Sequence, residues 1–236
     1  RAIKLAEENE TDIGPFIFKN FQNIALAKVS AWASFNDSEF SHARHVARLA
    51  LELFDGLATA RTPGPYADAR NRRLLHAAAL MHNVGHAEGR KGHHKASYRR
   101  IRKMALPLGW SDEDRQIAAL VARYHRGAWP RNQHQGFATL PPVRRETVLH
   151  LSGILRLAAA FDHDHTQAVR RLQVQCQPEA LLIWAQGYKD SSDNAQILAA
   201  ERHLLERTLR KPVIIRPRPL GPKRLQPHLA SATRVA

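Results

Sequence analysis

The sequence has 236 residues, 44% hydrophobic and 24% charged, which suits one large or two modest globular domains and excludes a wholly disordered or fibrous chain. No apolar run approaches the about 18 residues of a membrane span, and a single cysteine, Cys176, excludes an internal disulfide and a cysteine-based zinc cage. The 36 Lys and Arg against 21 Asp and Glu give a net charge of +15, which favours an anionic partner.

Residues 1–14 are polar and acidic, so they lack the basic and then apolar pattern of a secretory signal and are interpreted as a lead-in linker. With the single cysteine, this predicts a cytoplasmic protein without a membrane partner.

Helical periodicity begins at Pro15 and continues, with interruptions, to about Phe161. Turn residues at 36–38, 59–67 and 126–142 predict loops, and Ser111 with Asp114 matches a capping box at a helix start. The predicted helices cover about residues 15–35, 42–57, 68–82, 93–104, 112–124 and 143–161.

Beyond residue 165 the periodicity changes to alternation. Two strands are predicted at 172–176 and 180–185, then one helix at about 192–209 and a short strand at 213–215. The remaining 217–236 are basic and proline-rich, which predicts a disordered tail. The expected architecture is mainly α: a helical domain over 15–165, a small α/β appendix over 166–216 and the tail.

Several histidines and one aspartate fall at the ends of these helices or on their apolar stripes. Imidazole and carboxylate groups bind divalent metals, and such a metal generates hydroxide and neutralises phosphate oxygens. A histidine on an apolar stripe is more often a hydrogen-bonded core residue, so the spacing leaves both interpretations open. The candidates are His42, His82, Asn83, His93, His94, His125 and Asp162.

Five ordered segments resemble the HD-type carboxy-terminal half of the exopolyphosphatase / guanosine pentaphosphate phosphohydrolase (Ppx/GppA) family: residues 41–55, 74–85, 92–98, 122–126 and 154–162. The resemblance covers about residues 20–216. It implies an HD-type helical domain, a polyphosphate or guanosine polyphosphate partner, and a possible homodimer. It also implies that hydrolysis belongs to an amino-terminal actin-like region whose glycine-rich phosphate loop does not occur here, so the chain is either a fragment or a stand-alone relative.

The chain departs from the metal-binding HD pattern, which the resemblance describes as a histidine, an adjacent His-Asp pair and a late aspartate. His42 and His82 are kept, but Asn83 replaces the paired aspartate and Ala159 the late one, with Asp162 about one turn further on. Ala96 stands where the family usually has another histidine. We therefore expect a degenerate metal site at His42, His82, Asn83, His125 and Asp162, no cofactor, and no catalytic residue in this segment.

A cluster of cations predicts where phosphate binds. Lys95, Arg99 and Arg102 recur at helical spacing, and a polyphosphate chain held by such groups would dissociate with rising salt. The expected phosphate-binding residues are Arg90, Lys91, His93, His94, Lys95, Arg99, Arg123 and Arg126. The alternative is a solvated helix face.

Two further functions stay open at this point. The chain is either a self-sufficient metal-dependent HD phosphohydrolase, or a non-enzymatic module that binds polyanions or proteins. Nucleic acid is a less favoured partner, because the four tryptophans are scattered and no nucleic-acid motif is present.

Overall fold

The computed structural model describes residues 14–190 and 194–218, with side chains from residue 23. Residues 219–236 of the predicted tail and nearly all of the predicted lead-in fall outside the described residues. The first two residues of the predicted tail, Pro217 and Arg218, belong instead to a strand that was expected to end at residue 215. The helices that precede the sheet are α1 (Gly14–Asn36), α2 (Phe40–Thr59), α3 (Ala69–Met81), α4 (His93–Lys103), α5 (Asp112–Arg123), α6 (Gln135–Ala138) and α7 (Pro142–Ala160).

These helices confirm the predicted order, and local chemistry explains their ends. The α5 capping box forms as expected: Ser111 Oγ accepts the Asp114 N–H at 3.1 Å, and Asp114 Oδ2 accepts the Ser111 N–H at 2.9 Å. Asp68 caps α3 by accepting the Arg70 N–H at 2.7 Å.

A three-stranded sheet follows, made of β1 (Arg171–Cys176), β2 (Leu181–Gln186) and β3 (Val213–Arg218) in the order β1-β2-β3. β1 runs antiparallel to β2, with Leu172 opposite Ala185, whereas β3 runs parallel to β2. The parallel pairing needs a crossover, which α8 (Asn194–Glu201) and α9 (His203–Leu209) supply. Pro217 lies within β3, the edge strand, opposite Ala185.

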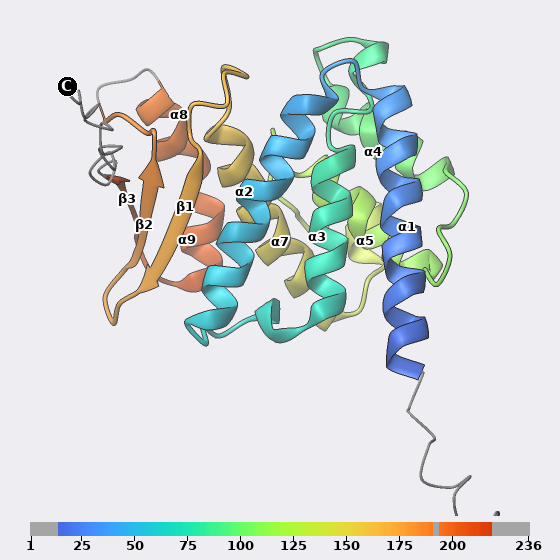
Figure 1. Ribbon diagram of the computed structural model, residues 1–236, viewed down its shortest axis with the longest axis horizontal. Coiled ribbons are helices and arrows are strands. Elements are labelled where there is room, and N and C mark those ends of the chain that lie inside the picture. The colour runs from blue at the N-terminus through green and yellow to red at the C-terminus, as the bar shows by residue number, and fades with distance from the viewer. Residues whose placement is uncertain (1–13, 191–193, 219–236) are drawn as a thin grey trace, which may run out of the picture.

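The sheet lies at one side of the molecule and α1 at the other, with α2, α7 and α3 between them (Figure 1). β1 packs on α2 and α9 packs on α7, so one buried core runs from the helices into the sheet. Gly56 of α2 permits this approach, because a Cβ there would lie 2.5 Å from Val174 Cβ.

Three predictions at the level of elements were wrong. The single helix expected at 192–209 is two helices, α8 and α9, that join at Arg202 and both pack on α7. The loop at 126–142 contains the short α6, which buries Phe137. The loop at 59–67 contains a 3₁₀ turn, Pro65–Ala67, which buries Tyr66.

Within residues 14–190 and 194–218, no helix combines the length and the apolar character needed to cross a bilayer.

Candidate functional site: a histidine cavity at the helix ends

A cavity of about 1000 Å³ lies where the ends of several helices meet; we call it the histidine cavity. His42 comes from the first turn of α2, His82 caps the end of α3, His93 begins α4, and His125 follows α5. The start of α2 and the end of α3 lie close to each other at the top of Figure 1. The sequence therefore places four imidazoles from four helix ends around one space.

The turn after α3 is tied directly to the first turns of α4. Ser97 Oγ donates to the His82 carbonyl at 2.7 Å and accepts the Gly85 N–H at 2.9 Å. A Cβ at Gly85 would lie 2.4 Å from both the His93 carbonyl oxygen and the Ser97 nitrogen. Glycine is thus required by the close approach of two backbones, and this contact fixes His82 relative to His93.

Asp162 fixes the orientation of the His42 ring through its Nδ1 atom. Its Oδ2 lies 2.7 Å from His42 Nδ1, and its Oδ1 accepts the Gln167 N–H at 2.6 Å. Burial alone would raise the pKa of Asp162, but these two hydrogen bonds outweigh it and lower the pKa. Both carboxylate oxygens are therefore occupied, and Asp162 positions the His42 ring without lining the cavity.

Three other imidazoles are oriented by backbone carbonyls. Nδ1 of His82 lies 2.6 Å from the Ala79 oxygen, and Nδ1 of His125 lies 2.7 Å from the Ala122 oxygen. His93 Nδ1 lies 2.9 Å from the oxygen of Arg90. Since a carbonyl only accepts, each Nδ1 carries the proton, which leaves Nε2 as an acceptor when the ring is neutral.

The imidazoles of His82 and His125, which we call the floor of the histidine cavity, are neutral near pH 7. Burial lowers the pKa of His82 and of His125 well below the usual value, and neighbouring imidazoles lower it further. Burial, followed by the charge of His93, lowers the pKa of His94 to about 4. The two Nε2 atoms of His93 and His125 lie 3.2 Å apart, so a proton gained there would turn two facing lone pairs into a hydrogen bond.

Cations stand at the rim of this neutral floor. Of the eight residues predicted to bind phosphate, five line the cavity: Arg90, Lys91, His93, His94 and Arg126. The other three, Lys95, Arg99 and Arg123, do not line it. Arg99 instead pairs with Glu88 at 2.7 Å, and the Arg123 guanidinium lies 5.4 Å from the centre of the Tyr98 ring.

The residues predicted as a degenerate metal site are only partly brought together. His42, His82, Asn83 and His125 line the cavity, as does Ala159, which offers no ligand atom. Asn83 has no charge, and Asp162 is turned away. In the part of the chain that the structure describes, no three His, Cys, Asp or Glu side chains form a group suited to a metal ion. This donor set does not fit a hard divalent cation, which prefers carboxylate oxygens.

Sequence reasoning missed Arg156, which also lines the cavity. Its Nη1 donates to the carbonyls of Tyr124 and Gly127 at 3.1 and 3.0 Å, and its Nε donates to Glu201 at 2.7 Å. Arg156 thus connects α7 with the loop after α5 and with α8. One signal was present in the sequence: an arginine inside the otherwise apolar run 154–160 is expected to have buried partners.

The fold and the site together define a class: a mainly helical domain with a small sheet, whose helix ends enclose an imidazole-lined cavity with cations at its rim. The family profile described as Ppx/GppA phosphatase, domain III, matches residues 28–208, so the chain belongs to the Ppx/GppA phosphatase family. Among curated proteins, no significant match to the sequence was found.

Proposed function

We propose that this chain is the carboxy-terminal accessory region of an exopolyphosphatase-type enzyme, and that the rim of the histidine cavity binds polyphosphate or a similar phosphate polyanion. The observation that carries the proposal is the pairing of a neutral floor with a positive rim. Family membership supplies the substrate class, and the rim supplies the chemistry that would recognise it.

The rim cations are free to meet an anion. Lys91 and Arg126 are exposed and have no carboxylate partner among the described residues. The Arg90 side chain is 88% exposed and lies 3.7 Å from Glu39, a contact too loose to neutralise it. The second carboxylate of the lining, Glu201, is held by Arg156 at 2.6 Å. The rim therefore has a positive field that a polyanion would meet first.

We further propose that the cavity works without a resident metal and that hydrolysis takes place in another region of the parent enzyme. Attack on a phosphoanhydride needs a base or a metal-bound water near the phosphorus. The two carboxylates that line the cavity are both engaged, Glu201 with Arg156 and Glu39 with His165 at 3.1 Å. The lowered pKa values of His82, His94 and His125 make these imidazoles weak bases. Asn83 and Ala159 add no anionic ligand.

The test is calorimetric binding of long-chain polyphosphate to the whole chain at low salt. The double variant Lys91→Ala/Arg126→Ala removes two rim charges, and Arg171→Ala/Arg216→Ala removes two exposed charges from the sheet. We expect the rim variant to bind about tenfold more weakly, since a charged hydrogen bond contributes about 1.5 kcal/mol. The sheet variant should change the affinity by less than about twofold, as expected for remote surface charges.

Equal losses in both variants would mean that polyphosphate meets only the general charge of the surface. No binding to the unmodified chain would favour an interaction module for proteins. Turnover of polyphosphate by the chain alone, with a metal required, would overturn the accessory role in favour of a self-sufficient enzyme.

A further inference from the structure

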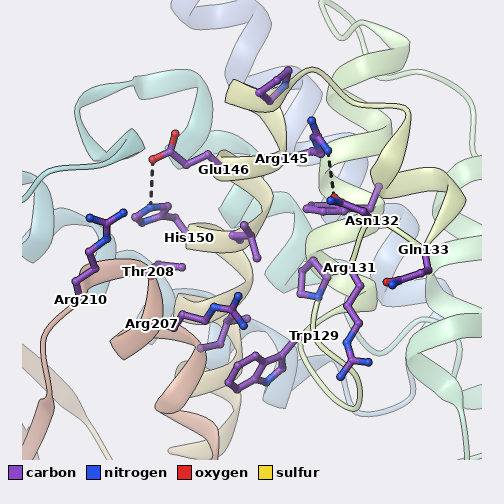
Figure 2. A pocket seen from close by; sticks show the side chains of 15 residues that line it. Trp129, Arg131, Asn132, Gln133, Arg145, Glu146, His150, Arg207, Thr208 and Arg210 are labelled. Atoms are coloured by element: carbon purple, nitrogen blue, oxygen red, sulfur yellow. Dashed lines mark hydrogen bonds and ion pairs between the residues drawn. The ribbon is translucent and has the colours of Figure 1, made fainter.

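A second cavity, of about 850 Å³, lies beyond the loop that follows His125. Its wall is formed by residues 129–133, by the first half of α7, and by α9 with its C-cap. Four guanidinium groups surround it, those of Arg131, Arg145, Arg207 and Arg210, and we call it the arginine pocket (Figure 2). None of these residues lines the histidine cavity.

These four arginines differ from the many others in the described residues that pair with a carboxylate. Arg70, Arg72 and Arg156 each hold a carboxylate within 2.8 Å. In contrast, Arg131, Arg207 and Arg210 have no carboxylate partner within the described residues. The Arg145 guanidinium donates only to the neutral Asn132 Oδ1, at 3.1 Å.

The pocket holds little negative charge to offset them. Glu146 is the one carboxylate among its lining residues, and it lies 3.8 Å from His150 Nε2. His150 is buried and bonded to the Tyr66 hydroxyl at 2.6 Å, so it closes the inner wall. Unpaired guanidinium groups gathered around a concave surface are the arrangement that binds phosphate oxygens in pairs.

The pocket also offers groups that an inorganic anion does not need. Trp129 is half-buried, with the Arg207 guanidinium 5.8 Å from its ring centre, and the exposed side chains of Asn132 and Gln133 belong to the same lining (Figure 2). A tryptophan ring stacks on a planar base, and amides bond to base edges. Phe137, Leu149 and Leu204 supply apolar wall.

We propose that the arginine pocket is a binding site for a nucleoside triphosphate, in which the arginines hold the phosphates and Trp129 contacts the base. Arg131, Arg145 and Arg210 contact the phosphate chain, and Arg207 keeps the Trp129 ring in place. This site is separate from the polyphosphate-binding rim and does not depend on it. Inorganic tripolyphosphate has the phosphoanhydride bonds of a nucleoside triphosphate but lacks its base. Comparing tripolyphosphate with a nucleoside triphosphate therefore separates binding by the arginines from binding by Trp129.

The experiment measures the affinities of ATP, GTP and tripolyphosphate for the whole chain by calorimetry, with tryptophan fluorescence as a second readout. The variants are Arg131→Ala/Arg210→Ala for the phosphates and Trp129→Phe for the base. The Arg171→Ala/Arg216→Ala chain is the charge-matched control, and Lys91→Ala/Arg126→Ala reports on the other cavity.

We expect the Arg131/Arg210 variant to bind all three ligands at least about tenfold more weakly, because each lost charged contact has a large effect. Trp129→Phe should weaken the binding of both nucleotides by about fivefold and leave the affinity for tripolyphosphate unchanged, as expected when only stacking on the base is reduced. The Lys91/Arg126 variant should bind nucleotides as the unmodified chain does.

Three results would overturn the proposal: no nucleotide binding to the unmodified chain, an equal loss in the sheet control, or nucleotide binding that is lost only in the Lys91/Arg126 variant. If tripolyphosphate binds as tightly as the nucleotides and Trp129→Phe has no effect, the proposed contact between Trp129 and the base is overturned. None of these results depends on whether long-chain polyphosphate binds at the histidine cavity.

Discussion

The histidine cavity and the arginine pocket are neighbours that use basic residues in opposite ways. In the first, the buried imidazoles of His82 and His125 are neutral near pH 7, the buried Arg156 is paired with Glu201, and the unpaired fixed charges stand at the rim. In the second, guanidinium groups that are exposed or, for Arg145, half-buried carry their charge at every physiological pH. A net charge of +15 therefore does not locate an anion site, because burial decides which histidines are charged.

The largest effect is expected at Arg156, a buried residue that lines the histidine cavity. Arg156→Ala removes the bonds to the carbonyls of Tyr124 and Gly127 and leaves Glu201 without its partner. The free energy of unfolding should fall by about 3 kcal/mol, as for other broken buried ion pairs. Chemical denaturation measures it, with Arg99→Ala as the control, since the exposed pair of Arg99 with Glu88 should contribute less than about 1 kcal/mol. A loss no larger than that of the control would contradict the connecting role.

The second prediction concerns a variant in which the histidine cavity should become a metal site. The double variant Asn83→Asp/Ala159→Asp places two carboxylates beside His42 and His82. We expect its Mn²⁺ affinity to rise by at least about a hundredfold over the unmodified chain, because hard cations need anionic oxygens. Calorimetry with Mn²⁺ tests this, and Asn132→Asp, which adds a carboxylate at the arginine pocket, is the control. An unmodified chain that already binds Mn²⁺ tightly would show that Asn83 is no obstacle.

A smaller loss of stability is expected for a change at Gly85, which should affect the histidine cavity and not the arginine pocket. Gly85→Ala drives a Cβ into the backbone of α4, so we expect a loss of about 2 kcal/mol in stability, within the range of other overpacked sites. The shift should displace His82 and weaken polyphosphate binding, while nucleotide binding at the arginine pocket stays unchanged. Gly89→Ala is the matched control for the loss of a glycine, since a Cβ there meets nothing within 4 Å, although its φ of +119° adds some backbone strain. Unchanged polyphosphate affinity in the folded Gly85 variant would contradict the coupling.

The smallest effect is expected in the dependence of the free energy of unfolding on pH. His82 and His125 have lowered pKa values in the folded chain, so the unfolded chain binds more protons below its own pKa of about 6.5. Stability is therefore fully present above about pH 6.5 and falls as the pH drops towards 5, by about 1.4 kcal/mol per pH unit for each histidine that stays neutral. Denaturation at several pH values measures this slope, and His125→Gln should reduce it.

Binding should respond to pH differently from stability. In the folded chain the imidazoles with lowered pKa values stay neutral over this range, so polyphosphate affinity should change little between pH 7 and 5.5. Nucleotide affinity at the arginine pocket should follow only the titration of the terminal phosphate. A rise of several-fold in polyphosphate affinity below pH 6.5 would show that imidazoles of the cavity take up protons together with the polymer.

The sequence predicted the helices well because each has its own signals, such as the Ser111 cap and the apolar stripe of α2. It also brought His42, His82 and His125 to one site through their positions at helix ends. It could not predict that Arg99 is paired with Glu88, since helical spacing shows a face and not what covers it. Nor could it find the arginine pocket, whose members come from a loop, from α7 and from α9 with its C-cap, and meet only through the packing of α9 on α7.

The edge strand β3 has a consequence for how copies of this chain behave at high concentration. An open strand edge invites a second sheet to add to it, which is a common route to aggregation. Pro217 interrupts the row of N–H donors on β3, and Arg216 and Arg218 on either side of it place like charges where a second copy would approach. Replacing Pro217 with valine would complete this row of donors, and we would expect the protein to lose solubility before it loses stability.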